Sequence, residues 1–210
     1  MISKAPIYLD HAATTPVDPR VAKAVMHHMV EDFGNAGSRT HEYGARSAAA
    51  SEQARKQIAV VVDAEPAEVI FTSGATESDN LALTGVMEKN KDRGNHLITC
   101  VTEHKAILDT AKHLEGQGFD VTYLPVNEFG EINLEELQSA ITDKTVLISI
   151  MAANNEIGTI ADIAEIGKIA HENDVFFHTD AAQAVGHIPI DVNKMNIDLM
   201  SFSSHKIYGP

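Results

Sequence analysis

The fold is decided by the stretch Thr145-Val-Leu-Ile-Ser-Ile-Met151, together with Val175-Phe-Phe-His-Thr179 further along the chain. Both runs are apolar and rich in branched or aromatic residues, which is typical of buried strands. Between them, a helical pattern covers residues 163–173. A strand, a helix and a second strand in this order predict two parallel strands of one sheet.

The same alternation continues along most of the chain. Asp18 and Pro19 are typical of the start of a helix, and apolar residues recur behind them at a spacing of four. Other strands are predicted over residues 68–72, 96–101, 120–124 and 198–202, and other helices over 45–62, 76–90, 105–116 and 134–141. We therefore expect an α/β fold, with a mostly parallel central sheet and helices on both faces. No repeat or linker interrupts the pattern, so no domain boundary is expected.

Composition and charge exclude several classes of protein. With 210 residues, 44% of them hydrophobic, the chain is large enough to bury one α/β core. Its net charge of -14 argues against direct binding to nucleic acid, because phosphate contacts need a basic face. The N-terminus has no apolar signal region, and no stretch approaches the roughly 18 apolar residues of a membrane span. We therefore expect a cytoplasmic protein, and its single cysteine, Cys100, suits a reducing compartment.

Ligands of open α/β sheets collect at the carboxyl ends of the strands, so the residues there are the candidates for a site. The first such cluster is Ser73-Gly74-Ala75-Thr76-Glu77-Ser78-Asp79. Gly74 permits a tight turn, and Thr76 with Asp79 resembles a capping box, so a helix N-terminus here would offer free N–H groups to a phosphate. An ordinary turn between strand and helix is the alternative. Neither the G-x-G-x-x-G fingerprint nor a P-loop motif is present.

Three further strand ends carry groups suited to a ligand. His104, in Thr102-Glu-His104, could stack on a cofactor ring and shuttle protons, or could be a polar residue at the start of a helix. The pair Asn154-Asn155 could hydrogen-bond a ligand oxygen or only form a turn. Asp180 follows a buried strand, so its charge needs a partner. A protonated pyridine nitrogen is one such partner, and a helix cap is the alternative.

The last cluster is Ser201-Phe-Ser203-Ser-His205-Lys206. Lys206 could hold an aldehyde cofactor through a Schiff base, with Ser203 and His205 beside a phosphate, or it could be a solvated residue before a turn. A phosphate cradle, an imidazole, an amide, a carboxylate and a lysine on successive strand ends are what pyridoxal 5'-phosphate (PLP) requires. The sequence therefore predicts a PLP site.

The motifs themselves resemble those of one family along nearly the whole chain. They are Tyr8-Leu-Asp-His-Ala-Ala-Thr-Thr-Pro16, Phe71-Thr-Ser-Gly-Ala-Thr-Glu-Ser78, Thr102-Glu-His-Lys105, Asn154-Asn-Glu-Ile-Gly158, His178-Thr-Asp-Ala-Ala-Gln183 and Ser203-Ser-His-Lys-Ile-Tyr-Gly-Pro210. In this order they resemble the cysteine desulfurases of the NifS/IscS type. The run from Phe33 to Gly44 is locally similar to the DndA-like desulfurases of DNA phosphorothioation.

The resemblance implies a fold, an activity and a role for each site residue. It implies the large PLP domain of the fold-type I aminotransferases, and the conversion of L-cysteine to L-alanine with sulfur passed on as a persulfide. It further implies that Lys206 is the Schiff-base lysine and the base at Cα, and that His104 stacks on the ring and takes part in catalysis. The other implied cofactor-binding residues are Ala75, Thr76, Ser203 and His205 at the phosphate, Asp180 at the ring nitrogen, and Asn155 and Gln183 near the ring and its phenolic oxygen.

One departure from the family pattern concerns sulfur transfer. In the family, the persulfide cysteine lies on a loop far beyond the cofactor lysine, in a part that also builds a small C-terminal domain. Residues 1–210 are thus expected to form the N-terminal segment and most of the large domain, and to be inactive alone, because Cys100 lies in a predicted buried strand. The expected full-length enzyme is a homodimer that serves a sulfur-acceptor protein of iron-sulfur assembly or DNA phosphorothioation. A selenocysteine lyase, a related class V aminotransferase and a non-catalytic binding fragment are the alternatives.

Overall fold

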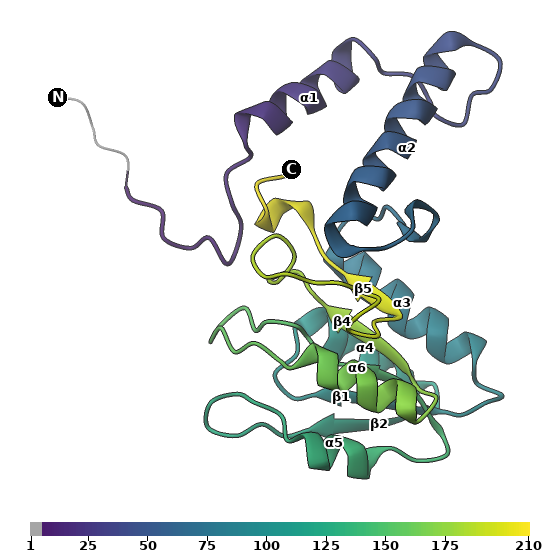
Figure 1. Cartoon of the computed structure of the whole chain (residues 1–210), viewed down its shortest axis with the longest axis vertical. Helices are drawn as coiled ribbons and strands as arrows, with labels where there is room; N and C mark the ends of the chain where they lie inside the picture. Colours follow the sequence, from purple (N-terminus) through teal and green to yellow (C-terminus); the bar gives the residue numbers. More distant parts are fainter. Residues whose placement is uncertain (1–5) are drawn as a thin grey trace.

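In the computed structural model, which describes residues 6–210, five parallel strands form one sheet in the order β2-β1-β3-β4-β5 (Figure 1). The strands are β1 His96–Cys100, β2 Asp120–Leu124, β3 Thr145–Ser149, β4 Phe176–Asp180 and β5 Leu199–Ser201. The α-helices are α1 Pro19–Val30, α2 Glu42–Val62, α3 Ala75–Lys89, α4 Lys105–Gly116, α5 Leu134–Ala140 and α6 Ile163–Glu172, and the 3-10 turns are η1 Pro66–Glu68 and η2 Ser204–Lys206. The predicted α/β fold with a parallel sheet is confirmed.

Successive residues of the central strands point into two different cores. Leu97 in β1 and Leu147 in β3 are fully buried in one cluster with the apolar faces of α3 and α4. Their neighbours Ile98 and Ile148 are buried in the other cluster, with residues of α5 and α6. Because side chains alternate across a strand, a run that is apolar at every position must be covered on both faces. This is why helices lie on both sides of the sheet.

The strand predicted over residues 68–72 is wrong. Glu68 ends the turn η1, and the residues after it are extended but pair with no strand among residues 6–210. The carbonyl of Val69 accepts a hydrogen bond from the Arg55 side chain instead, and Ile70 and Phe71 are exposed. An extended apolar run becomes a strand only when a neighbour pairs with its backbone, and that neighbour is not visible in the run itself.

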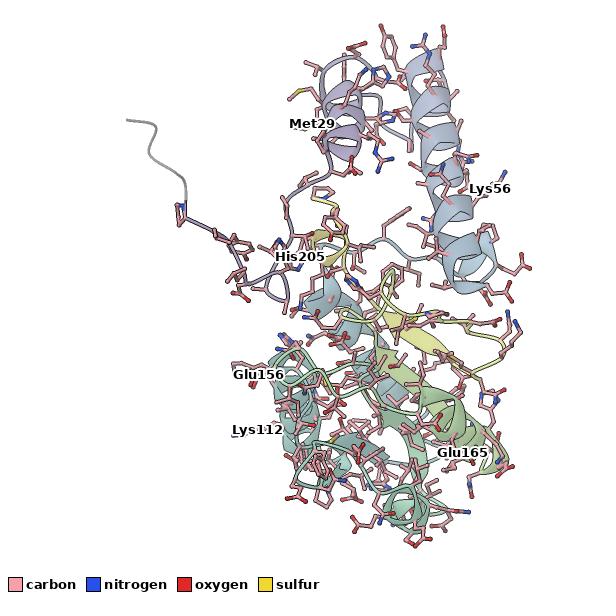
Figure 2. The ribbon with its side chains drawn as sticks, turned by 60° about the vertical axis from the view of Figure 1, so that its left-hand side comes forward. Met29, Lys56, Lys112, Glu156, Glu165 and His205 are labelled. Carbon is pink, nitrogen blue, oxygen red and sulfur yellow. The ribbon has the colours of Figure 1, made fainter. Side chains whose placement is uncertain are left out.

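The two N-terminal helices stand away from the sheet (Figure 1), with Met29 on α1 and Lys56 on α2 marking them in Figure 2. The helix α1 begins as predicted, because the Asp18 carboxylate accepts the N–H of Arg20 at 2.8 Å and Pro19 is the first helical residue. None of its residues is buried, and Met29 is 71% exposed. No helix among residues 6–210 has the length and apolar character needed to cross a membrane.

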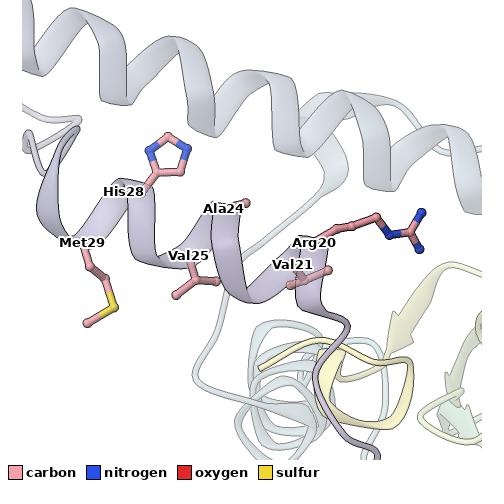
Figure 3. A pocket seen from close by; sticks show the side chains of 6 residues that line it. All are labelled: Arg20, Val21, Ala24, Val25, His28 and Met29. Atoms are coloured by element: carbon pink, nitrogen blue, oxygen red, sulfur yellow. The ribbon is translucent and has the colours of Figure 1, made fainter.

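A shallow depression of about 630 Å³ follows this apolar side of α1 (Figure 3). Val21, Val25 and Met29 line it at a spacing of four residues. The lining contains one cation, Arg20, and one imidazole, His28, but no carboxylate, hydroxyl or lysine. The depression therefore lacks the set of groups that the predicted chemistry needs.

A close contact of α6 gives a first testable prediction. A methyl group added at Gly167 would lie 2.0 Å from the carbonyl oxygen of Met195, so the helix and that loop would have to separate. We expect Gly167→Ala to lower the free energy of unfolding by about 1 to 3 kcal/mol, measured by urea denaturation. Gly85→Ala in α3 is the matched control, since an added methyl group there meets no atom within 4 Å. It should raise stability by about 0.5 to 1 kcal/mol, and equal stability of the two variants would contradict the packing described.

Candidate active site

A pocket of about 660 Å³ lies at the carboxyl ends of the strands. Loops after β1, β3, β4 and β5 meet there, and the N-terminus of α3 and the arm carrying Asp10 and Ala12 complete the wall. Glu156 and His205, two of its lining residues, lie on the same side of the molecule (Figure 2). Every residue predicted for the site lines this pocket: Ala75, Thr76, His104, Asn155, Asp180, Gln183, Ser203, His205 and Lys206.

One end of the pocket is the N-terminus of α3. Gly74 is the N-cap, with φ of 157°, a conformation that favours glycine, and no side chain caps the helix. The predicted capping box between Thr76 and Asp79 is wrong, because Thr76 lies inside the helix and Asp79 is fully buried. The first helical N–H groups, at Ala75 and Thr76, have no partner within the helix, and a fifteen-residue helix places its positive dipole end here. This end of the pocket is therefore suited to an anion.

Ser203 and His205 reach the pocket from the end of β5. The Ser203 hydroxyl is buried and has no hydrogen-bond partner among the described residues. The ring of His205 is held by the Thr14 hydroxyl, 3.1 Å from Nδ1, and its carbonyl accepts the N–H of Thr15 at 2.9 Å. A buried hydroxyl without a partner costs free energy unless a ligand satisfies it. A phosphate oxygen is such a ligand.

His104 and Asp180 lie close together in the pocket, with one nitrogen and one oxygen within 4.8 Å of each other. His104 is the N-cap of α4, and its Nδ1 accepts the N–H of Ala106 at 3.1 Å. His104 thus starts a helix and also lines the pocket, and its stacking on a cofactor ring stays a prediction. Asp180 is 4% exposed and accepts the N–H of Ala182 at 2.9 Å, which makes a turn rather than a helix cap.

The surroundings of Asp180 act on its pKa in both directions. Burial raises the pKa of its carboxyl above the usual value, and the Ala182 N–H and the interactions with His104 and Lys206 offset only part of this rise. Lys206 comes from η2, directly after β5, and is half-buried. A lysine amine that lines a pocket can react with an aldehyde and, once released again, can transfer protons.

The two neighbouring asparagines have different tasks. Asn154 forms the turn: its Oδ1 accepts the N–H groups of Glu156 and Ile157, and its Nδ2 donates to the carbonyl of Thr102 at 3.0 Å. Asn155 is the one that lines the pocket. Gln183 donates its amide to the carbonyl of Ala12 at 2.7 Å, which holds the N-terminal arm against the pocket.

Three buried polar residues behind the pocket were missed by reasoning from the sequence. Glu103 accepts the N–H of Met151 at 2.7 Å, joins the loops after β1 and β3, and has its pKa raised well above the usual value by burial. His178 in β4 is fully buried between two serine hydroxyls, and Asp79 lies beside it. The position of Asp79 could have been inferred from its spacing, because residues three apart, such as Thr76 and Asp79, lie on the same face of a helix.

These groups fit PLP. The free N–H groups of α3 and the unpartnered Ser203 hydroxyl suit its phosphate, and the buried carboxylate of Asp180 suits a protonated ring nitrogen. His104 lies beside that carboxylate, where it can cover the face of a ring, and Lys206 is the amine for the aldehyde.

Known proteins resemble the chain along nearly its whole length. The model of the family "Aminotransferase class-V" matches residues 7–210. A "Probable cysteine desulfurase, mitochondrial" of Dictyostelium discoideum is 58% identical over 207 residues, which are 99% of this chain and 46% of the relative. The chain thus spans about half the length of this curated relative.

Solved structures show the same fold. A "NIFS-LIKE PROTEIN" superposes with a TM-score of 0.94 at 41% identity, covering 97% of this chain and 56% of that one. The crystal structure of DndA from Streptomyces lividans superposes with a TM-score of 0.83 at 45% identity, covering 97% of this chain and 57% of that one.

Proposed function

Because the chain belongs to the class-V aminotransferase family, we propose that the protein is a cysteine desulfurase, which converts L-cysteine to L-alanine and passes the sulfur on as a persulfide. The family depends on PLP. The observation that carries the proposal is the convergence of all the predicted site residues on one pocket. The high identity to a relative named a cysteine desulfurase supports the choice of reaction.

The proposal assigns roles to several residues of the pocket. The α3 N-terminus, Ser203 and His205 would hold the phosphate, and His104 would cover one face of the ring. Asp180 would balance the charge of a protonated ring nitrogen, and Lys206 would supply the amine that bonds to the aldehyde carbon and, once the substrate amine has displaced it, the base for the proton at the substrate Cα. When bound, PLP supplies an electron sink for the charge that develops at that carbon.

Cys100 is not the sulfur acceptor in this proposal. It lies in β1, is 3% exposed, and burial raises the pKa of its thiol. A persulfide-forming cysteine needs access to the substrate and an accessible thiolate, so a packed thiol of this kind is unsuited.

The test supplies the full-length enzyme, of which residues 1–210 would form the N-terminal part, with PLP and L-cysteine, and measures alanine, sulfide and the mass of each cysteine-containing peptide. The proposal expects one alanine for each sulfur atom transferred, with the persulfide on a cysteine outside residues 1–210, none on Cys100, and unchanged alanine release in Cys100→Ala. Faster alanine release from selenocysteine than from cysteine would favour a selenocysteine lyase. A bound PLP absorbance without alanine would favour a non-catalytic binding protein.

The wider setting is part of the same proposal. Residues 1–210 would supply the N-terminal segment and most of the PLP domain of a homodimeric enzyme. The sulfur would go to an acceptor protein, either an iron-sulfur scaffold or a component of DNA phosphorothioation. Similarity to DndA supports the second destination, and the name of the Dictyostelium relative supports a general desulfurase. A cytoplasmic location stays a prediction, since that relative is named as mitochondrial.

A further inference from the structure

Asp79 is a buried carboxyl group with nothing to satisfy it. It lies in α3, five residues after the N-cap Gly74, and is fully buried. Neither of its carboxyl oxygens has a hydrogen-bond partner among residues 6–210. The ring of His178 lies beside it, with Nε2 3.8 Å from Oδ1. An ionised carboxylate in such a place is costly unless a cation balances it.

His178 does not provide that cation. Its ring is fully buried, with Nδ1 2.9 Å from the Ser149 hydroxyl and Nε2 3.0 Å from the Ser201 hydroxyl. Burial lowers its pKa to about 3, so the imidazole is neutral at ordinary pH. Two hydroxyl groups, and no carboxylate, satisfy its two nitrogens. Asp79 therefore faces a neutral ring.

The other charged groups around Asp79 favour a single negative charge. Asp180 lies within 4.8 Å of Asp79, measured between one oxygen of each, and two carboxylates at that distance repel each other. Glu103 is a third buried carboxyl group near this pair, and the charges of Asp180 and Asp79 help to raise its pKa. Burial raises the pKa of both carboxyls, but Asp180 accepts the N–H of Ala182, and interactions with His104 and Lys206 lower its pKa. Asp180 therefore carries a negative charge more readily than Asp79.

We propose that Asp79 is a positioning residue, which carries a proton in the folded protein and thereby leaves the negative charge at the floor of the pocket on Asp180. The use of that charge, to hold the ring nitrogen of PLP, rests on the proposed function. The protonation of Asp79 does not, because it follows from groups that belong to this chain alone. Burial, and then repulsion by Asp180, raises the pKa of Asp79 to about 7. The Ser201 hydroxyl lowers this pKa, but less, and it is already bonded to His178.

The direct test follows the side-chain carboxyl carbons of aspartate by NMR in the cofactor-free protein between pH 4 and pH 9. Asp79→Asn identifies the resonance, and the proposal expects it to titrate near pH 7. Asp180→Asn should lower the pKa of Asp79 by about one unit or more, because it removes the like charge. Glu88→Gln, which removes an exposed carboxyl group from the same helix, is the matched control and should leave the pKa of Asp79 unchanged. An Asp79 resonance that is fully ionised at pH 5, or one indifferent to Asp180→Asn, would overturn the proposal.

Stability gives a second measurement that needs no resonance assignment. Between about pH 4 and pH 7 the unfolded wild type releases the proton that folded Asp79 keeps. Its unfolding constant, relative to that of Asp79→Asn, should therefore rise about tenfold per pH unit in this window and level off above it. A ratio that does not change with pH would overturn the proposal.

The same preparation separates this proposal from the proposed function. Adding PLP and recording its absorbance, with Lys206→Ala as reference, tests the cofactor site. Failure to bind PLP would count against the proposed enzyme activity. It would not affect the proposal for Asp79, which is decided by the titration alone. If Asp79→Asn fails to fold, the effect of Asp180→Asn on the aspartate resonance that ionises at the highest pH still tests whether Asp79 carries the proton.

Discussion

In the full-length enzyme, Lys206→Ala is expected to abolish covalent attachment of PLP and to reduce cysteine turnover to background. Lys206 is the lysine of the pocket, half-buried after β5 and close enough to lower the pKa of Asp180. No other lysine lines the pocket, so no other amine in the described chain can replace it there. The fold should survive, because a lysine at the edge of a pocket contributes little packing.

Borohydride reduction followed by peptide mapping is the measurement. The wild type should yield a pyridoxyl group on the peptide that contains Lys206, and Lys206→Ala should yield none. Lys105→Ala is the matched control: that lysine follows His104 directly, but its side chain is 79% exposed and its amine is paired with Asp109 at 2.6 Å. A native wild-type sample labelled mainly at a lysine other than Lys206 would contradict the site described.

The sheet could be predicted because its strands are apolar on both faces. Leu97 with Ile98, and Leu147 with Ile148, send adjacent side chains into different cores, and such runs are typical of central parallel strands. Residues 68–72 have the same composition but do not form a strand. The difference lies in pairing, which depends on chain segments remote in the sequence, so composition alone could not separate the two cases.

The site could be predicted because parallel strands end at one edge of the sheet. From this rule, His104, Asp180 and Lys206, which follow or end three different strands, could be predicted to lie in one pocket. The rule could not tell which of Asn154 and Asn155 faces the pocket, since that depends on the turn between them and Gly158.

The rule also could not place Asp79. As part of a helix start it resembled an exposed cap, and its burial results from the packing of α3 against β3, β4 and β5. The burial of Asp79 follows from helix packing, which no short sequence motif records.

Asp180→Asn is expected to slow turnover by the full-length enzyme by about one to two decades while leaving the phosphate end of the pocket intact. The loss of one charge-assisted hydrogen bond is worth about 1.5 to 3 kcal/mol, and this converts into that factor if the bond acts in the transition state. An amide is neutral, so it cannot stabilise a protonated ring nitrogen as a carboxylate does.

The asparagine also separates the two interpretations of Asp180. Its side-chain oxygen can still accept the N–H of Ala182, so the turn after β4 is kept and only the charge is lost. Asp162→Asn is the matched control, because Asp162 caps α6 by accepting the N–H of Glu165 at 3.1 Å and lies outside the pocket. We expect kcat to fall in Asp180→Asn and to be unchanged in Asp162→Asn, with PLP still retained by both. Equal kcat in wild type and Asp180→Asn would mean that this carboxylate serves the turn alone, and the pocket would then lack the charge on which the proposed chemistry depends.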